Sequence, residues 1–225
     1  MARLDRRLKL VARLASARQR VKLGLFVCEG EDLVDAARAE GMEPVELLVA
    51  GENVEPTQLA SVSSLGYPPR VIAIFAKDAL QQTVTRQGAG VALWHVGDPG
   101  NVGTLIRSVD ALGGAFVALS DGCADPTGPK AVRASMGALF RVPLLQFEDA
   151  PRPWTALVPR GGDRLGPIER GAYVLGSERE GLPEDLLARC DGRATIPLSA
   201  GAESLNVAMA GTIALYEASR RPAAS

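Results

Sequence analysis

The chain has 225 residues, of which 47% are hydrophobic and 23% are charged, and its net charge is −1, which is the composition of an ordinary soluble globular protein of one or two domains. No apolar run reaches the roughly 18 residues of a membrane-spanning helix, and the basic N-terminal segment lacks the apolar core of a signal peptide, so we expect a cytoplasmic protein. The cysteines lie far apart without a Cys-x-x-Cys pair, which argues against a zinc site and a disulfide framework. These three cysteines are Cys28, Cys123 and Cys190. We therefore expect no bound metal.

The N-terminal segment is basic although the whole chain is nearly neutral. It holds eight Lys and Arg residues from Arg3 to Lys22 and a single acid, Asp5. A solvated helix face explains such a cluster, and so does the binding of nucleic-acid phosphate. Both interpretations stay open on these residues alone.

Strand-like and helix-like segments alternate over the first part of the chain, which predicts a small α/β sandwich in residues 1–86. A basic N-terminal helix comes first. The expected strands are then 25–28, 45–49 and 71–75, and the expected helices are 33–40 and 56–65. A polar segment with two glycines, 81–90, is the expected linker.

The remaining residues, 87–225, predict a second α/β domain with a parallel sheet. Its expected buried strands are 91–96, 115–119, 172–175 and 194–196. The only histidine, His95, lies in the first of these strands, and we interpret it as a core residue rather than a catalyst. Ligands of parallel sheets bind beyond the carboxyl ends of the strands, which places the loop 97–103 in a binding position. That loop has no Gly-x-Gly-x-x-Gly, which disfavours a Rossmann-type cofactor site.

Further candidate residues for ligand binding lie later in the chain, after a predicted strand and on a predicted helix. Glu178 comes just after the carboxyl end of a predicted strand and is a candidate catalytic or positioning carboxylate. Gly176, two residues earlier, would let a ligand approach the backbone closely. Lys130 and Arg133 lie one turn apart on a predicted helix, 130–138, where they can grip a phosphate.

The C-terminal segment predicts a helix that opens at residues 203–204, with Ser204 as its N-cap. Asn206 would then lie in the first turn, where a buried amide needs a hydrogen-bond partner. Either these side chains form a capping network, or Ser204 and Asn206 face a polar ligand. Apolar residues at helical spacing predict a buried stripe on this helix, namely Leu205, Met209, Thr212 and Tyr216.

Four stretches of the second domain resemble motifs of the SpoU/TrmH family of RNA ribose 2′-O-methyltransferases, within the SPOUT superfamily. Residues 98–107 are similar to the family's Asn-Pro-x-Asn-x-Gly-x-x-x-Arg, with Asp98 where Asn is usual. The other three stretches are 130–138, which resembles Lys-Ala-x-Arg-Ala-Ser-x-Gly-Ala, 176–183, which resembles the second motif, and 196–208, which resembles the third.

Two further comparisons with the family concern the rest of the chain. Glu29 and Gly30 resemble a signature of the N-terminal RNA substrate-binding domain that some members carry. Over 152–170 the chain is rich in Pro, Gly and Arg and looks abbreviated beside the family's fuller helix and strand. We therefore expect a loop in this segment that orders on RNA binding.

The resemblance implies a fold of two parts: a small α/β substrate-binding domain in residues 1–86, and an α/β-knot SPOUT domain, a trefoil-knotted parallel sheet, in residues 87–225. It also implies S-adenosylmethionine-dependent methylation of a ribose 2′-hydroxyl in RNA by a homodimer. The N-terminal domain favours ribosomal (23S) RNA, because the simplest tRNA-modifying members lack it. A tRNA ribose 2′-O-methyltransferase and a non-catalytic RNA-binding homologue are the alternatives.

The same motifs imply the residue roles. Arg107 would bind the neighbouring phosphate and stabilise the developing alkoxide rather than act as the base, because a guanidinium is hard to deprotonate. Lys130 and Arg133 would contact RNA. Met209, Ile213 and Tyr216 fit a dimer interface and core packing equally well. The other catalytic residues would be Asn101, Glu178, Ser204 and Asn206, and the cofactor residues Leu175, Gly176, Ile196, Leu198 and Leu205.

Overall fold

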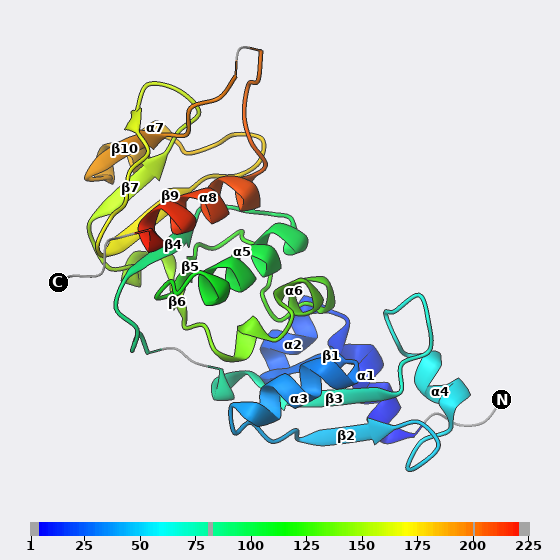
Figure 1. The fold of residues 1–225 in the computed structure, drawn as a ribbon. Helices are drawn as coiled ribbons and strands as arrows, with labels where there is room; N and C mark the ends of the chain where they lie inside the picture. The colour runs from blue at the N-terminus through cyan, green and yellow to red at the C-terminus, as the bar shows by residue number, and fades with distance from the viewer. Residues whose placement is uncertain (1–4, 81–82, 200, 221–225) are drawn as a thin grey trace.

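The computed structural model describes residues 5–80, 83–199 and 201–220, which form two sheets joined along the chain (Figure 1). Arg3 of the basic cluster and Gln81 and Gln82 of the predicted linker lie outside these residues. Within the described ranges no helix is long and apolar enough to cross a membrane.

The N-terminal part is a three-stranded antiparallel sheet in the order β1-β3-β2 with short helices packed on it. The basic segment forms two helices rather than the expected one, because the chain turns at Ala15 and Ser16. The expected helix over 56–65 stops at Ala60. The elements are α1 (Arg6–Leu14), α2 (Ala17–Leu23), β1 (Leu25–Glu29), α3 (Glu31–Ala39), β2 (Glu46–Val49), α4 (Pro56–Ala60), β3 (Val71–Ala76) and the 3₁₀ turn η1 (Lys77–Ala79).

The C-terminal part is a seven-stranded sheet in the order β6-β5-β4-β9-β7-β10-β8, and all its paired strands are parallel. The expected parallel sheet is therefore confirmed. The elements are β4 (Ala89–Leu93), α5 (Pro99–Ala111), β5 (Val117–Leu119), α6 (Pro129–Ser135), η2 (Ala138–Phe140), β6 (Leu144–Gln146), η3 (Phe147–Asp149), β7 (Trp154–Leu157), β8 (Asp163–Arg164), β9 (Gly171–Leu175), α7 (Glu184–Arg189), β10 (Gly192–Thr195) and α8 (Val207–Ser219).

Both faces of this sheet are buried, which explains its continuous apolar strands. Val91 and Tyr173 face α5 and α8, while Ala92 and Val174 face the layer that contains Trp154 and α7. Successive residues of β4 and β9 thus point into different cores, as the two-residue period of a strand requires. Helices α5 and α8 lie side by side on one face (Figure 1).

The expectation of a loop over 152–170 was wrong for two short stretches, which are the strands β7 and β8. β7 lies inside the sheet, between β9 and β10, and β8 forms its edge. Trp154 anchors β7: its side chain is buried, and its backbone N–H donates to Asp191 Oδ2 at 2.7 Å. The sheet order also puts β10 between β7 and β8, two strands that follow each other in the chain.

His95 does not lie in a strand, as we had expected, because β4 ends at Leu93. The chain bends there, and His95 takes the left-handed backbone conformation (φ 52°) that turns its side chain out of the sheet. The imidazole is exposed and stacks on the ring of Trp94, with 4.6 Å between the ring centroids. The interpretation of His95 as a core residue was therefore wrong.

The two parts of the chain share one continuous core. Phe26 and Phe75 of the first sheet pack against Phe140, which follows α6, with ring centroids 5.7–6.3 Å apart. Arg20 on α2 is only 5% exposed, and its Nε donates to Asp125 Oδ2 at 2.8 Å. Helix α6 consequently lies at the junction between the two parts (Figure 1).

Candidate active site

Three loops meet beyond the carboxyl ends of the central strands. They follow β4 (residues 94–98), β9 (residues 176–183) and β10 (residues 196–206). Because parallel strands end at the same edge of a sheet, segments far apart in the sequence come together here. The loops after β9 and β10, and the first turn of α5 that follows the loop after β4, carry side chains that the sequence had marked as candidates.

A chain of hydrogen bonds joins the three loops. Asn101 Nδ2 donates to Glu178 Oε1 at 2.8 Å, and Asn206 Nδ2 donates to Asn101 Oδ1 at 3.1 Å. The backbone N–H groups of Gly97 and Asp98 also point at the Glu178 carboxylate, each at 3.3 Å. Asn101, Glu178 and Asn206, three of the five expected catalytic residues, are thus brought into direct contact.

The Glu178 carboxylate is held in its ionised form. Partial burial raises its pKa, but the hydrogen bonds from Asn101, from its own backbone N–H and from Gly97 and Asp98 outweigh this effect. The net result is a pKa below the ordinary value of 4.5. Glu178 is therefore an anion near neutral pH that accepts hydrogen bonds and holds the loop after β4 against the loop after β9.

Asn206, and not Ser204, caps the last helix. Its Oδ1 accepts from the backbone N–H groups of Ala208 (2.9 Å) and Met209 (3.2 Å), and α8 begins at Val207. The expected start at 203–204 was wrong by about one turn, because an Asn side chain caps a helix as well as a Ser does. Ser204 stays in the loop, exposed.

The predicted buried stripe was wrong for three of its four residues, because Thr212 alone packs against α5. Met209 is 61% exposed, Tyr216 is 51% exposed, and Leu205 is exposed as well. Instead, small residues face the core: a Cβ on Gly211 would lie 2.4 Å from Leu105 Cδ2, and Thr212 Oγ1 contacts Ser108 Oγ at 2.7 Å. Close packing of α8 on α5 therefore leaves the large apolar side chains at the surface.

A cavity of about 690 Å³ lies beside the hydrogen-bonded chain, between the loops after β9 and β10. All five expected cofactor residues line it: Leu175, Gly176, Ile196, Leu198 and Leu205. Glu178, Ser204 and Asn206 line it too, so the candidate catalytic and cofactor residues share one space. Its size is within the range of small-molecule sites.

The apolar wall and charged rim of this cavity fit S-adenosylmethionine. The apolar side chains suit an adenine ring and the methionine chain, while Arg160, Arg193 and Glu184 line the same cavity and suit the charged ends of the ligand. These three charged residues lie in segments without a motif, so no pattern in the sequence marks them as site residues. Among the described residues no group of three His, Cys, Asp or Glu side chains could hold a metal ion.

Gly176 also has a packing role that the sequence did not predict. A Cβ at this position would lie 2.2 Å from the Gly181 carbonyl carbon and 2.6 Å from the Leu182 nitrogen. The space that a Cβ of Gly176 would occupy is therefore filled by the protein's own backbone. The glycine lets the loop after β9 fold back tightly on itself.

Arg107 is separate from the hydrogen-bonded chain. It lies on the same helix as Asn101 but about 9 Å further along the axis. Its side chain is exposed, and it has no hydrogen-bond or ion-pair partner among the residues that the structure describes. A free guanidinium at this place is available to an anionic ligand.

Asp98, the position that departs from the family motif, caps α5. Its Oδ1 accepts from the backbone N–H groups of Gly100 (2.7 Å) and Asn101 (3.1 Å), and its Oδ2 pairs with Lys130 Nζ at 2.8 Å. The hydrogen bond from Lys130 and those from the backbone lower the pKa of Asp98. The Asp-Pro pair signals such a cap, since Pro99 takes the first helical position.

The two expected RNA-binding cations have protein partners of different kinds. Lys130 forms the ion pair with Asp98, whereas Arg133 Nη1 donates to the neutral hydroxyl of Ser64 in the N-terminal part, at 2.7 Å. They point to different neighbours, although they lie one turn apart on α6.

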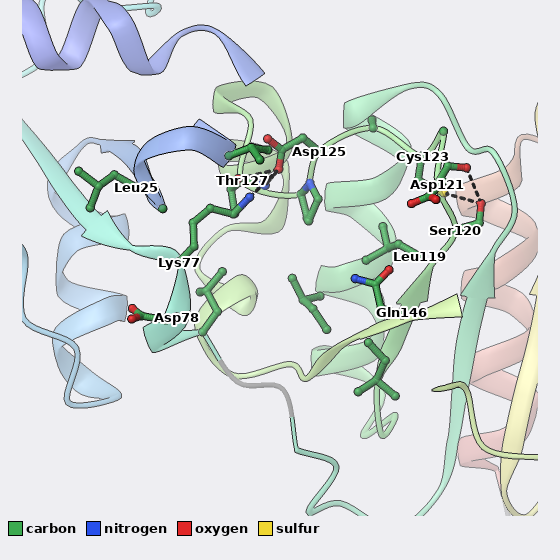
Figure 2. A pocket seen from close by; sticks show the side chains of 18 of the residues that line it. Leu25, Lys77, Asp78, Leu119, Ser120, Asp121, Cys123, Asp125, Thr127 and Gln146 are labelled. Atoms are coloured by element: carbon green, nitrogen blue, oxygen red, sulfur yellow. Dashed lines mark hydrogen bonds and ion pairs between the residues drawn. The ribbon is translucent and has the colours of Figure 1, made fainter. Parts of the chain in front are cut away.

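A second cavity, of about 890 Å³, lies between the two parts of the chain and contains none of the predicted site residues (Figure 2). Lys77 and Asp125 pair across it at 3.8 Å. Its other charged side chains are Asp78, Asp121 and Asp149, so its surface is acidic. Because acidic groups repel phosphate, the smaller cavity is the better candidate for a site that acts on RNA.

Comparison with known proteins agrees with this assignment. Residues 89–216 match the model of the SpoU rRNA methylase family. The chain is 30% identical to the 23S rRNA (guanosine(2553)-2′-O)-methyltransferase RlmP of Bacillus subtilis, with 91% of this chain and 92% of that protein covered.

Two solved structures have the same fold. The SpoU methyltransferase AviRb of Streptomyces viridochromogenes, in complex with AdoMet, superposes with a TM-score of 0.84 at 25% identity, over 96% of this chain and 97% of that one. The AdoMet-bound rRNA methyltransferase of Sinorhizobium meliloti gives a TM-score of 0.83 at 26% identity, over 96% and 95%. The family match spans more than half of the chain, and residues of the second and third motifs line one cavity, so this protein belongs to the SpoU rRNA methylase family.

Proposed function

We propose that this enzyme transfers a methyl group from S-adenosylmethionine to a ribose 2′-hydroxyl of large-subunit ribosomal RNA. The observation that carries the proposal is the hydrogen-bonded chain Glu178–Asn101–Asn206 at the edge of a cofactor-sized cavity. Relatives named as 23S rRNA 2′-O-methyltransferases support the choice of substrate. The site of action is then the cytoplasm, where ribosomal RNA is matured.

Leu175, Gly176, Ile196, Leu198 and Leu205 hold the cofactor in this proposal. Bound S-adenosylmethionine supplies an electrophilic methyl group on a sulfonium that leaves readily. The tight loop at Gly176 fixes the wall of the cavity, because its backbone is in contact with Gly181 and Leu182. The protein's main contribution is to position the ribose, which is worth up to about 7–11 kcal/mol of the barrier.

Asn101 and Asn206 orient the ribose. Each side-chain amide carries two N–H groups, and each uses one of them within the hydrogen-bonded chain. One N–H of each residue remains for a ribose oxygen. Glu178 fixes the direction of both amides, since an ionised carboxylate can only accept. Ser204, in the exposed loop at the same cavity, adds a hydroxyl to the pocket.

Arg107 binds the phosphate next to the target ribose. Its guanidinium is exposed and unpaired among the described residues, so its full charge is available to stabilise oxygen as the proton leaves the 2′-hydroxyl. It does not take the proton itself, because an arginine stays protonated; the proton passes to solvent water.

The RNA contacts extend along α6 to the N-terminal domain, for which we propose residues 1–86 as the boundary. Arg133 contacts RNA directly, and Lys130 does so beside its Asp98 partner. The exposed cations of α1 and α2, among them Lys9 and Arg18, continue this surface. Residues 87–225 form the methyltransferase domain, whose C-terminal loops carry the knot.

The exposed face of α8 forms a homodimer interface. Met209, Ile213 and Tyr216 recur at helical spacing and are 36–61% exposed. Apolar side chains grouped in this way mark a contact surface. In a symmetric dimer the two α8 helices meet, and each active site then lies close to the partner chain.

To test this proposal, the purified protein is incubated with tritiated S-adenosylmethionine and with unmodified RNA separated into ribosomal and transfer fractions. The tritium incorporated into each fraction is then measured. Label in the large-subunit ribosomal RNA is the expected result. Label in tRNA alone would make the protein a tRNA methyltransferase. Cofactor binding without label in any RNA would make it a non-catalytic RNA-binding relative.

A further inference from the structure

The contact between Arg133 and the N-terminal domain points to a positioning device. Arg133 Nη1 donates to Ser64 Oγ at 2.7 Å, and Ser64 Oγ in turn donates to the Glu29 carboxylate at Oε1. Three residues from two domains thus form one relay. It joins the Glu-Gly signature of the N-terminal domain to the Lys-Ala-x-Arg motif of the catalytic domain.

Glu29 holds Ser64 firmly. Its side chain is 8% exposed, and its carboxylate accepts from the backbone N–H of Ser64 at 3.1 Å and from the hydroxyl of Ser63. A buried carboxylate with several donors keeps those donors in fixed places, because each lost bond would leave a buried charge less satisfied. The Ser64 hydroxyl proton therefore points to Glu29, and its oxygen faces Arg133 as an acceptor.

The end of α6 packs closely against helix α3 of the N-terminal domain. A Cβ on Gly137 would lie 2.6 Å from the Cβ of Ala36 on α3, so the chain after α6 is packed closely against the N-terminal domain. At the start of α6, the Arg20 guanidinium contacts the loop that contains Asp125 and Gly128. The N-terminal domain thus holds α6 at both ends.

The relay orients Arg133 without neutralising it. Its only described partner is the neutral Ser64 hydroxyl, which uses one of the five guanidinium N–H groups. Lys130, by contrast, is paired with a carboxylate. An ordered cation with free donors binds phosphate better than a mobile one, since less side-chain freedom is lost on binding.

We infer that Glu29 and Ser64 are positioning residues that set Arg133 for an RNA phosphate, so that the N-terminal domain tunes an RNA contact made by the catalytic domain. This inference rests on the RNA-binding role proposed above for Arg133. It assigns the Glu-Gly signature a task other than direct contact with RNA.

The test is a titration of the full-length protein with an in vitro transcript of 23S ribosomal RNA at several salt concentrations, without cofactor. Arg133→Ala should reduce the slope of log affinity against log salt by about 0.7–0.9, as expected for one lost phosphate contact. Ser64→Ala should weaken binding about 3- to 10-fold and reduce the slope in the same direction. Ser64→Thr, which keeps the hydroxyl, should restore both values.

Two controls separate positioning from folding. Ser61→Ala removes a hydroxyl in the same region that bonds only the Gln58 carbonyl, and it should match the wild type. The double variant Ser64→Ala/Arg133→Ala should bind no more weakly than Arg133→Ala alone, because Ser64 acts through Arg133.

The inference would be overturned if Ser64→Ala bound the transcript with wild-type affinity and slope. It would also be overturned if the losses of affinity in the two single variants multiplied in the double variant, or if the wild-type protein did not bind the transcript. The titration does not depend on methyl transfer. A protein that binds RNA through this relay but methylates none would contradict the proposed function and leave the inference standing.

Discussion

Replacing Gly176 by alanine inserts a methyl group into the backbone of the neighbouring loop. The new Cβ would lie 2.2 Å from the carbonyl carbon of Gly181 and 2.3 Å from its oxygen. Ordinary contacts between such atoms are about 3.5–4.0 Å, so one loop has to move by more than about 1 Å. Both partners are backbone, and neither can yield by a side-chain rotation.

We expect the Gly176→Ala variant to lose about 3 kcal/mol or more of unfolding free energy, at the upper end of overpacking effects. For a chain of this size that is roughly 6–12 °C in melting temperature. The same displacement opens the cavity wall, and an error of about 1 Å in a binding site can cost about 100-fold. The affinity for S-adenosylmethionine should therefore fall by about that factor.

Thermal melting followed by circular dichroism, with calorimetric titration of S-adenosylmethionine, measures both effects. Gly192→Ala is the matched control, since its Cβ would meet nothing within 4 Å and its backbone is not left-handed. A Gly176→Ala protein that melts with the control and binds the cofactor normally would refute the argument that this tight loop shapes the site.

Four further predictions, which use five substitutions, test the site and the exposed face of α8. Arg107→Ala should leave the melting temperature nearly unchanged, because the side chain is exposed and unpaired among the described residues, and should lower methyl transfer at least 100-fold; near-normal rates would remove Arg107 from the mechanism. Glu178→Gln should lower the melting temperature by the same amount at all pH values above about 5. The difference in melting temperature between wild type and variant should disappear as pH falls below 4.5, because a carboxylate with a lowered pKa stabilises the fold only while it is ionised. A difference that persists at low pH would contradict this. Asn206→Ala should cost about 0.5–2 kcal/mol of unfolding free energy, and Ser204→Ala should cost much less, in denaturant titrations; equal losses would contradict the assignment of the cap. Ile213→Asp should shift the mass in light scattering from dimer to monomer, whereas an unchanged dimer would place the interface elsewhere.

The sheet and the convergence of the motifs could be predicted from the sequence. Continuous apolar runs such as 172–175 indicate buried parallel strands, and loops at the carboxyl ends of such strands meet at one edge. Glu178 lies in one of these loops and Asn101 in the helical turn that follows another, which is why they are found 2.8 Å apart. Neither inference needs knowledge of side-chain packing.

The details that failed depend on packing and on competition between similar residues. Ser204 and Asn206 are both good caps, and periodicity does not choose between them. Small residues decided which face of α8 is buried: Gly211 permits close contact with α5, whereas an apolar stripe alone suggests the opposite face. β7 was missed because Pro and Gly flank it, although Trp154 anchors it in the sheet interior.

The role of Arg133 depends on a contact that no local pattern contains. Its partner Ser64 lies 69 residues earlier in the chain, in a loop fixed by Glu29. Sequence spacing placed Arg133 beside Lys130 on one helix face, but the structure gives the two cations different neighbours. Such long-range pairs follow only from the folded arrangement of the two parts of the chain.

The central claim is methyl transfer to a ribose oxygen, and alkaline hydrolysis tests it most directly. A 2′-O-methyl group removes the hydroxyl that attacks the next phosphodiester, so the labelled nucleotide survives as part of a dinucleotide. After reaction of the enzyme with tritiated S-adenosylmethionine and a 23S ribosomal RNA transcript, we predict that the label is recovered in alkali-resistant dinucleotides. Label recovered in mononucleotides would place the methyl group on a base and contradict the account.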